Sequence, residues 1–426
     1  MNKELRQNHF VFDGCDTVEI AEQYGTPLYV ISETIIKHKC REIREDYLLK
    51  YDNTRAVYAG KAFLNLEMCR LVTNEGLGLD VVSGGELYTA IKADVPMENI
   101  IFHGNNKSQD ELQMAVLNNV GRIVVDNGYE LDRLNKIAEN HNRTVNILFR
   151  ITPGISPDTH KFISTGQVDS KFGFSMQNNN LYDYVFKTKN MRHINLRGFH
   201  FHIGSQLLSN ESHLKALEVL LYLIRELNEK LDFVTAEINV GGGFGISYTK
   251  EDKTKNIRYF VDPMMKKIHD HCNRYSLITP QVIIEPGRWV VGEAGITLYS
   301  VGSIKEIPGI RTYVSVDGGM PDNPRPSLYN AKYSAVIANR YDDKRNRTVT
   351  IAGKCCESGD ILIWDLKVPA VEPGDVLAVM STGAYNYSMS SNYNKLPRPA
   401  VVMVNKGVSR LIVRRETYDD LITRDV

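Results

Sequence analysis

Residues 56–82, AVYAGKAFLNLEMCRLVTNEGLGLDVV, decide the fold of this chain. The short apolar run at residues 56–59 predicts a buried strand, and the segment 64–75 predicts a helix that stops at Gly76. A second apolar run at residues 79–82 predicts the next strand. A strand, a helix and a strand in this order are typical of a unit in which the two strands lie parallel.

The same alternation continues along the chain. Six further strands are expected at residues 99–103, 122–126, 145–150, 196–202, 236–240 and 282–285. The intervening segments read as helices, one beginning near Glu86, one capped by Ser108, and one with Leu217, Leu220, Leu221, Ile224 and Leu227 on a single face. Eight parallel strands predict a closed (β/α)₈ TIM-like barrel. A doubly wound open sheet is the main alternative, because periodicity alone does not exclude it.

The pattern changes after Glu285. Four β-rich stretches follow at residues 290–316, 348–363, 376–380 and 400–413, separated by turn signals such as Pro308-Gly309. They predict a second, mostly antiparallel β domain, to which the opening segment with residues 28–31 is expected to add a strand. We therefore expect a barrel at residues 36–288 and a β domain built from residues 1–35 and 289–426.

Composition limits the class of protein. The 426 residues suit about two domains, and equal numbers of basic and acidic residues, 51 of each, give no electrostatic reason to expect nucleic acid or an anionic membrane as partner. No apolar stretch approaches the roughly 18 residues that span a bilayer, and the first residues lack a secretory signal. The six cysteines include no C-x-x-C pair, which favours reduced thiols and a cytoplasmic location.

Nearly every expected barrel strand ends in a polar residue or glycine. These positions are Lys61, Asp80, His103, Asp126, Arg150, His202, the run Gly241-Gly242-Gly243, and Glu285. Because active sites of such barrels lie at the carboxyl ends of the strands, we expect the chemistry there.

Each of these residues also has an ordinary structural interpretation. Lys61 could be a solvated lysine or a Schiff-base lysine, since a partly desolvated amine loses its proton more easily. The glycine run could be a turn or a phosphate-binding loop. Glu285 could pair with Arg288 or hold a pyridinium nitrogen protonated. His200 and His202 could ligate a metal, but spacing shows no third ligand, and we expect none.

A series of motifs resembles the diaminopimelate decarboxylases, a family of fold III pyridoxal-phosphate enzymes. In the barrel they are YAGKA (58–62), LDVVSGGEL (79–87), HGNNKS (103–108), HFHIGSQ (200–206), NVGGG (239–243) and EPGR (285–288). Later come VDGGMPDNPRPSLY (316–329), CESGD (356–360), GAYNYSMSSNYN (383–394) and RRETY (414–418). Many separate motifs in the same order make the resemblance specific, and it runs almost from end to end.

The resemblance implies a pyridoxal 5′-phosphate cofactor and a role for each matching residue. Lys61 would carry the cofactor covalently, and His202 would stack on its ring. Glu285 would pair with the ring nitrogen, and Arg150 would lie near the phenolic oxygen. The remaining cofactor-binding residues would be Asp80, Ser205, Gly241, Gly242, Gly243, Gly287, Arg288 and Tyr385. Substrate-binding residues would be Arg288, Arg325, Tyr329, Glu357 and Tyr385.

The resemblance also implies that Cys356 is the proton donor and that it reaches the site from the partner subunit of a homodimer. The residues alone do not choose between Cys355 and Cys356. The expected reaction is decarboxylation of meso-2,6-diaminopimelate to L-lysine, because Arg325, Tyr329 and Arg288 would recognise a second carboxylate.

Other functions stay open at this point. On the same fold, a decarboxylase of ornithine, lysine, arginine or carboxynorspermidine is the main alternative. The two-domain length and the CESGD loop favour a decarboxylase over a racemase. A non-catalytic pyridoxal-phosphate carrier is the alternative of another class, and the expected C-terminal β domain argues against it.

Overall fold

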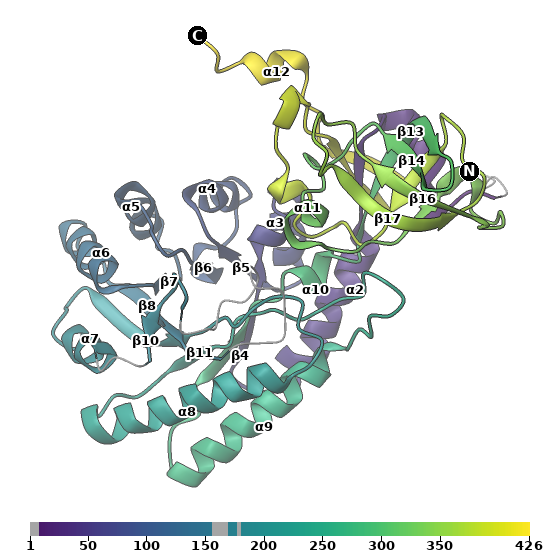
Figure 1. Cartoon of the computed structure of the whole chain (residues 1–426). Helices are drawn as coiled ribbons and strands as arrows, with labels where there is room; N and C mark the ends of the chain where they lie inside the picture. The colour runs from purple at the N-terminus through teal and green to yellow at the C-terminus, as the bar shows by residue number, and fades with distance from the viewer. Residues whose placement is uncertain (1–7, 156–168, 177–179) are drawn as a thin grey trace. The chain divides into compact units, whose positions relative to one another are not determined.

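The computed structural model describes residues 8–155, 169–176 and 180–426, and the chain divides into two compact units (Figure 1). The barrel unit comprises Lys39–Ile246 and Thr254–Trp289. The β unit comprises the N-terminal segment up to His38 together with Ser247–Lys253 and Val290–Val426. The short segment Ser247–Lys253 thus leaves the barrel unit just after the glycine run.

Eight parallel strands close the barrel. They are β4 (Thr54–Ala59), β5 (Gly78–Val81), β6 (Ile100–Phe102), β7 (Arg122–Val125), β8 (Val145–Thr152), β10 (Ile194–His200), β11 (Glu237–Asn239) and β12 (Gln281–Ile284). Each strand pairs with the next in parallel, β8 pairs with β10, and β12 returns to β4. The closed circuit confirms the predicted barrel, because an open sheet would leave two of these edges unpaired.

Apolar side chains fill the inside of this barrel. Val57, Ile101, Val124, Leu148 and Ile283 form one buried cluster, contributed by five different strands. Short strands of continuous apolar residues are what a sheet covered on both faces requires. The barrel is therefore a packed core, and polar chemistry is confined to its ends.

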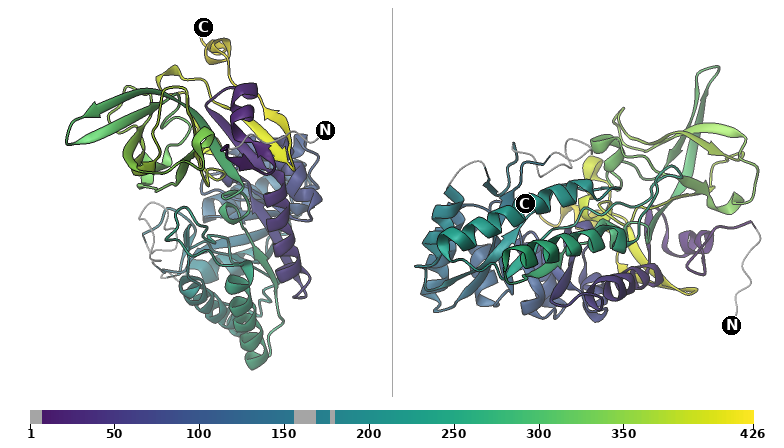
Figure 2. Two further views of the ribbon diagram at one scale, coloured as in Figure 1. Left: turned by 90° about the vertical axis from the view of Figure 1, so that its right-hand side faces the viewer. Right: turned by 90° about the horizontal axis from the view of Figure 1, so that it is seen from below.

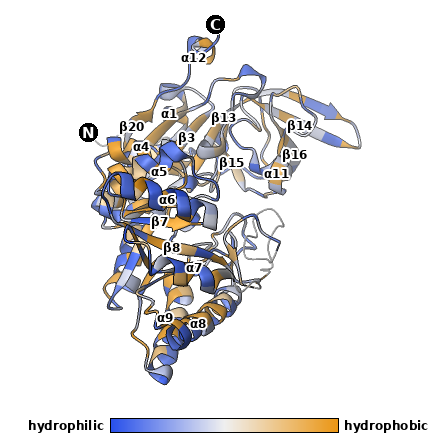
Figure 3. Cartoon of the chain, turned by 90° about the vertical axis from the view of Figure 1, so that its left-hand side faces the viewer, coloured by the Kyte–Doolittle hydropathy of each residue, from blue (hydrophilic) through white to orange (hydrophobic). Residues whose placement is uncertain are grey.

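Helices surround the strands in the predicted alternation. They are α2 (Glu33–Ile43), α3 (Leu66–Asn74), α4 (Gly84–Lys92), α5 (Gln109–Leu117), α6 (Gly128–Asn140), α7 (Asn180–Thr188), α8 (Glu211–Leu231), α9 (Ile257–Tyr275) and α10 (Arg288–Val291). Ser108 caps α5 through a capping box, as predicted. Figure 3 shows α6 largely in the hydrophilic colour where it faces the viewer, while Leu131, Leu134 and Ile137 are buried. α8 and α9 run side by side (Figure 2).

Three details of the barrel differ from the expectation. α3 begins at Leu66, because Asn65 accepts a hydrogen bond from the Met68 amide and acts as the N-cap. The two-residue strand β9 (Phe174–Ser175) pairs with β8 and was too short to give a pattern. Residues 288–291 form the short helix α10 rather than part of a strand.

The β unit contains a mixed, mostly antiparallel sheet. Its strands are β3 (Leu28–Ser32), β13 (Gly295–Ile307), β14 (Arg311–Val316), β15 (Ala335–Ile337), β16 (Arg347–Ala352), β17 (Ile361–Val368), β18 (Val376–Val379), β19 (Ala400–Asn405) and β20 (Val408–Val413). β3 from the N-terminal segment lies between β13 and β19, which confirms that the opening residues join this domain. Only β3 with β19 and β14 with β16 pair in parallel in the described sheet.

Smaller elements complete the β unit. They are the strands β1 (Val11–Phe12) and β2 (Cys15–Asp16) and the helices α1 (Thr17–Tyr24), α11 (Arg325–Tyr329) and α12 (Tyr418–Ile422). Leu28, Val30, Ile296, Leu298 and Val402 belong to its core cluster and interlock the N-terminal strand with C-terminal ones. Across both units, the helices that the structure describes include none with the length and apolar character needed to cross a membrane.

Candidate active site at the carboxyl ends of the barrel strands

Lys61 lies on a single 3₁₀ turn, Gly60–Ala62, directly after β4. A Cβ atom on Gly60 would lie 2.9 Å from the carbonyl oxygen of Asp80, and one on Gly287 would lie 2.9 Å from the Ala59 side chain. Both positions therefore need glycine so that the neighbouring strands can end close together. The predicted Schiff-base lysine is thus half-buried at the mouth of the barrel, on a short rigid turn.

Glu285 stands at the centre of a buried hydrogen-bond network. It follows β12, while His103 follows β6 and Asn239 ends β11. His103 Nε2 lies 2.7 Å from Glu285 Oε1, and Asn239 Nδ2 donates to the same oxygen at 2.6 Å. Burial favours the neutral acid, but contacts with His103 and His200 hold the pKa of Glu285 well below its usual value. The network therefore keeps an ionised carboxylate in a dry site, where it can hold a cationic ring N–H.

A second carboxylate in the same site has the opposite tendency. Asp80 is the last but one residue of β5, and its Oδ1 lies 3.7 Å from His103 Nε2. Burial raises the pKa of Asp80 to about 6, although His103 opposes this shift. The surroundings of Asp80 therefore favour its neutral form, whereas the histidine neighbours of Glu285 favour its charged form.

His200 rather than His202 belongs to this network. His200 is the last residue of β10, and its Nε2 lies 3.4 Å from Glu285 Oε2. Burial lowers the pKa of His200 to about 3, so its imidazole is neutral. His103, His200 and Glu285 offer three potential ligating atoms within 4.8 Å of one another, a set that spacing did not reveal. Because Glu285 Oε1 already lies at hydrogen-bond distance from two nitrogens, we interpret the set as a hydrogen-bond network, and the absence of a metal stays a prediction.

The glycine run forms a loop into which side chains do not fit. Gly241 and Gly243 have φ angles of +68° and +94°, and a Cβ on Gly242 would lie 2.1 Å from the carbonyl oxygen of Glu285. The Gly242 amide donates to His202 Nδ1 at 3.3 Å, and its carbonyl lies 2.9 Å from His213 Nε2. Backbone N–H groups in a tightly held glycine loop are suited to a phosphate.

Two more predicted cofactor residues meet beside this loop. Arg288 Nη2 donates to Ser205 Oγ at 2.9 Å, which joins the start of α10 to the loop after β10.

Arg150, on β8, is buried with its guanidinium 4.1 Å from the Phe172 ring centroid. The barrel thus brings the predicted lysine, carboxylates, glycine loop and arginines to the same ends of its strands. These residues fit pyridoxal phosphate, because an amine, an ionised acid and a glycine cradle occur together.

The five site residues predicted in the β unit are spread over three of its segments. Arg325 begins α11 and Tyr329 ends it, while Tyr385 has a φ angle of +63°, which is unusual for a residue with a side chain. Cys356 and Glu357 are exposed on the loop between β16 and β17.

The two adjacent cysteines have different environments. The Cys356 thiol side chain is exposed, and its backbone amide donates to Asn394 Oδ1 at 2.9 Å. Cys355 is half-buried, and its amide donates to Asp360 Oδ2 at 2.9 Å. Burial and the neighbouring Asp360 raise the pKa of the Cys355 thiol to about 12. Of the two thiols, Cys356 is the one open to a reacting atom.

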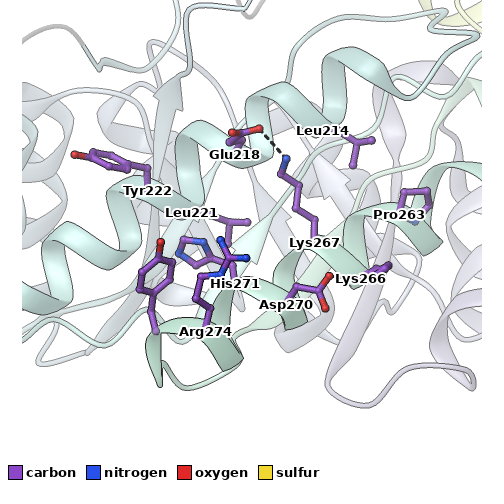
Figure 4. Close-up of a pocket in the computed structure, with 11 residues that line it drawn as sticks. Leu214, Glu218, Leu221, Tyr222, Pro263, Lys266, Lys267, Asp270, His271 and Arg274 are labelled. Atoms are coloured by element: carbon purple, nitrogen blue, oxygen red, sulfur yellow. Dashed lines mark hydrogen bonds and ion pairs between the residues drawn. The ribbon is translucent and has the colours of Figure 1, made fainter.

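A cavity of about 490 Å³ lies elsewhere, on the outer surface between α8 and α9 (Figure 4). Two of its lysines are paired, Lys267 with Glu218 and Lys266 with Asp270, each at 2.7 Å. The cavity contains none of the predicted site residues. It therefore does not compete with the barrel mouth as a candidate active site.

Sequence reasoning missed two members of the Glu285 network and undervalued a third. Asn239 was quoted in a motif without a role, His200 was considered only as a metal ligand, and His103 was noted only as a polar residue at a strand end. The signal available was their position, since each ends a barrel strand or directly follows one. The link between His103 and Glu285 could not be found from the sequence, because β6 is not adjacent to β12 in the sheet.

A family model and individual relatives from other organisms agree on the family that this chain resembles. The family described as pyridoxal-dependent decarboxylase, pyridoxal binding domain, matches residues 34–292. Diaminopimelate decarboxylase of Bacillus subtilis (strain 168) is 46% identical over 425 residues, covering 100% of this chain and 97% of its own. The corresponding protein of Staphylococcus aureus (strain COL) is 42% identical over 430 residues, covering 100% of both.

Solved structures agree over the same length. Diaminopimelate decarboxylase from M. jannaschii, in complex with L-lysine, has a TM-score of 0.93 and 36% identity, covering 99% of this chain and 97% of that one. The enzyme from Helicobacter pylori complexed with L-lysine has a TM-score of 0.86 and 31% identity, covering 96% of this chain and 98% of that one.

Proposed function

The chain belongs to the diaminopimelate decarboxylases, and we propose from this premise that it converts meso-diaminopimelate to L-lysine and carbon dioxide with the barrel residues described above. The observation that carries the proposal is the network at Glu285, in which His103 and Asn239 lie 2.7 Å and 2.6 Å from one carboxylate oxygen. Burying a carboxylate is costly even when neighbours partly compensate it, so such a network at the end of a barrel indicates a functional site.

Bound pyridoxal phosphate supplies an electron sink for the electron pair that remains when carbon dioxide leaves. Lys61 would hold the cofactor through its side-chain amine, which lies on the turn directly after β4. Glu285, kept ionised by its histidine neighbours, would accept a hydrogen bond from the ring nitrogen of the cofactor and favour its protonated form. His202, Arg150 and Asp80 are proposed to orient the ring.

The remaining residues hold the phosphate and the substrate. Gly241, Gly242, Gly243, Gly287 and Ser205 are proposed to surround the phosphate, with Tyr385 completing the cofactor site. Arg288, Arg325 and Tyr329 are proposed to bind the substrate's second carboxylate, since arginine recognises carboxylates in a fork. Glu357 is proposed to take the distal ammonium group.

The proton that replaces the lost carboxylate is proposed to come from Cys356. Its thiol is exposed, whereas the Cys355 thiol is half-buried beside Asp360. We also propose that the active form is a homodimer, in which Cys356 serves the site of the partner subunit. Sedimentation of the holoenzyme tests this proposal, since a monomer with full activity would contradict it.

One assay tests the function directly. Purified protein supplied with pyridoxal phosphate should release carbon dioxide and lysine from meso-diaminopimelate in equal amounts. Ornithine, lysine and arginine should be poor substrates, because they offer no second carboxylate and would leave a buried arginine unpaired. Comparable rates with ornithine or lysine would show a broader basic amino-acid decarboxylase, and absence of any carbon dioxide release would leave a pyridoxal-phosphate carrier.

A further inference from the structure

Arg325 is a buried cation without an acidic partner. It lies at the start of α11 in the β unit with 6% of its surface exposed. In the part of the chain that the structure describes, the side-chain contacts of its guanidinium are with two tyrosines and with no carboxylate. Because a buried charge is strongly unfavourable without compensation, this arrangement indicates an anion that arrives from outside the chain.

The two tyrosines fix the guanidinium from different directions. Arg325 Nη1 donates to the Tyr333 hydroxyl at 2.5 Å, and the centroid of the Tyr248 ring lies 4.9 Å from Arg325 Cζ. The two rings meet edge to face, with centroids 5.3 Å apart and planes at 87°. Tyr248 comes from the segment Ser247–Lys253, which belongs to the β unit although it follows the glycine run in the chain.

These contacts hold the arginine without neutralising it. A phenol hydroxyl and an aromatic face both favour a cation, but neither carries a full negative charge. The guanidinium makes side-chain hydrogen bonds with both Tyr333 and Tyr248, and because arginine has five N–H donors, the fork keeps further donors for a carboxylate. A carboxylate in the chain at the same place would instead compete with the ligand.

We propose that Tyr333 and Tyr248 are positioning residues that hold Arg325 ready for the substrate carboxylate that is not removed. This inference rests on the proposed function, because it takes diaminopimelate as the substrate. Decarboxylation removes one of the two carboxylates of diaminopimelate, so the lysine product still carries the other. The binding of the substrate and the binding of the product should therefore both depend on Tyr333 and Tyr248.

The test uses the full-length holoenzyme and two inhibitors, L-lysine and L-lysinamide. Lysinamide has a neutral amide where lysine has its carboxylate, and it should inhibit the wild-type enzyme much more weakly. In Tyr333→Phe, the KM for diaminopimelate and the inhibition constant of lysine should each rise roughly tenfold, the size expected for a lost hydrogen bond to a charged group. The kcat and the inhibition constant of lysinamide should stay within about twofold, because Arg325 does not touch the reacting carbon in this assignment.

Two further variants distinguish the loss of Arg325 positioning from general damage to the structure. Tyr341→Phe makes the same change on a half-exposed tyrosine of the same unit and should leave every constant unchanged. Tyr248→Leu removes the aromatic face and should raise the KM and the lysine constant without altering the cofactor absorbance. Equal inhibition of the wild type by lysine and lysinamide would overturn the inference, as would a Tyr333→Phe enzyme whose two inhibition constants rise together or do not move. Failure of the wild type to release carbon dioxide from diaminopimelate would instead refute the proposed function.

Discussion

His103 Nε2 and Glu285 Oε1 lie 2.7 Å apart, although the two residues follow strands that are not neighbours in the barrel sheet. The bond crosses the mouth of the barrel and uses the carboxylate oxygen that Asn239 also contacts. The second oxygen, Oε2, has His200 Nε2 at 3.4 Å. The contacts with His103 and His200 favour the charged form of Glu285, which is the form that we propose holds a ring N–H.

Replacing His103 should therefore weaken catalysis without removing the cofactor. His103→Leu leaves Asn239 as the remaining donor to Oε1, so the pKa of Glu285 should rise and its carboxylate should hold the ring nitrogen less firmly. We expect kcat to fall roughly tenfold or more, as for other lost hydrogen bonds to a buried charge. Steady-state rates together with the visible absorbance spectrum measure both effects. An enzyme with a wild-type kcat would show that Asn239 alone is sufficient.

Lys61→Ala should abolish covalent attachment of the cofactor. Borohydride reduction of the wild-type holoenzyme should label a peptide that contains Lys61, and the variant should give no labelled peptide. Turnover should fall by about a thousandfold or more, because the variant lacks the amine that we propose carries the cofactor. A label on a different lysine of the wild type would contradict the assignment even if the variant were inactive.

The barrel could be predicted from the sequence because each strand is a short apolar run that ends in a polar residue or glycine, as at Ala59-Gly60-Lys61. The number of strands predicted a closed barrel, but local pattern could not exclude an open sheet, since the pairing of β8 with β10 and of β12 with β4 depends on strand tilt. The two-residue strand β9 was too short to give a period.

Some residues of the candidate site could be predicted from the sequence and others could not, for a physical reason. Residues with a motif of their own, such as Lys61 and Glu285, could be placed by resemblance. His103, His200 and Asn239 act through one shared carboxylate, and that relationship exists only when strands β6, β10, β11 and β12 have come together around the barrel axis. From the residues alone, Cys355 and Cys356 could not be told apart, because the difference between their environments depends on where the Asp360 carboxylate lies.

The two cysteines should differ in their effect on the reaction. Cys356→Ala should slow the return of the proton to the α carbon and lower kcat about a hundredfold, within the range seen for lost general acids. Cys355→Ala should change kcat little, because burial and Asp360 raise the pKa of that thiol to about 12 and hold it in the loop. Rates in heavy water check the assignment, since the solvent isotope effect should change in the first variant only. A larger loss in Cys355→Ala would reverse the two roles.

Gly242→Ala should damage the phosphate loop. Its Cβ would lie 2.1 Å from the carbonyl oxygen of Glu285, so the loop or the end of β12 has to move. We expect the affinity for pyridoxal phosphate to fall and the melting temperature of the protein to drop, with a cost of about 1–3 kcal/mol typical of overpacking. Gly85→Ala is the matched control, because its added Cβ meets no atom closer than 3.8 Å at the start of α4. Equal melting temperatures for the two variants would show that the loop has room that the static contacts do not reveal.

His213 should make the holoenzyme sensitive to mild acid. Burial lowers the pKa of His213 to about 4 from its usual 6.5, although its bond with the Gly242 carbonyl opposes the shift. Between these two values the unfolded chain binds a proton that the folded chain excludes, so stability present above pH 6.5 is lost as the pH falls toward 4. The loss from this one group is about 3 kcal/mol, since each pKa unit is worth about 1.4 kcal/mol. His213→Gln keeps an amide donor without a titrating group, so its urea midpoint should decline less steeply over this pH range than that of the wild type. Parallel declines for the two proteins would mean that other groups govern the acid response.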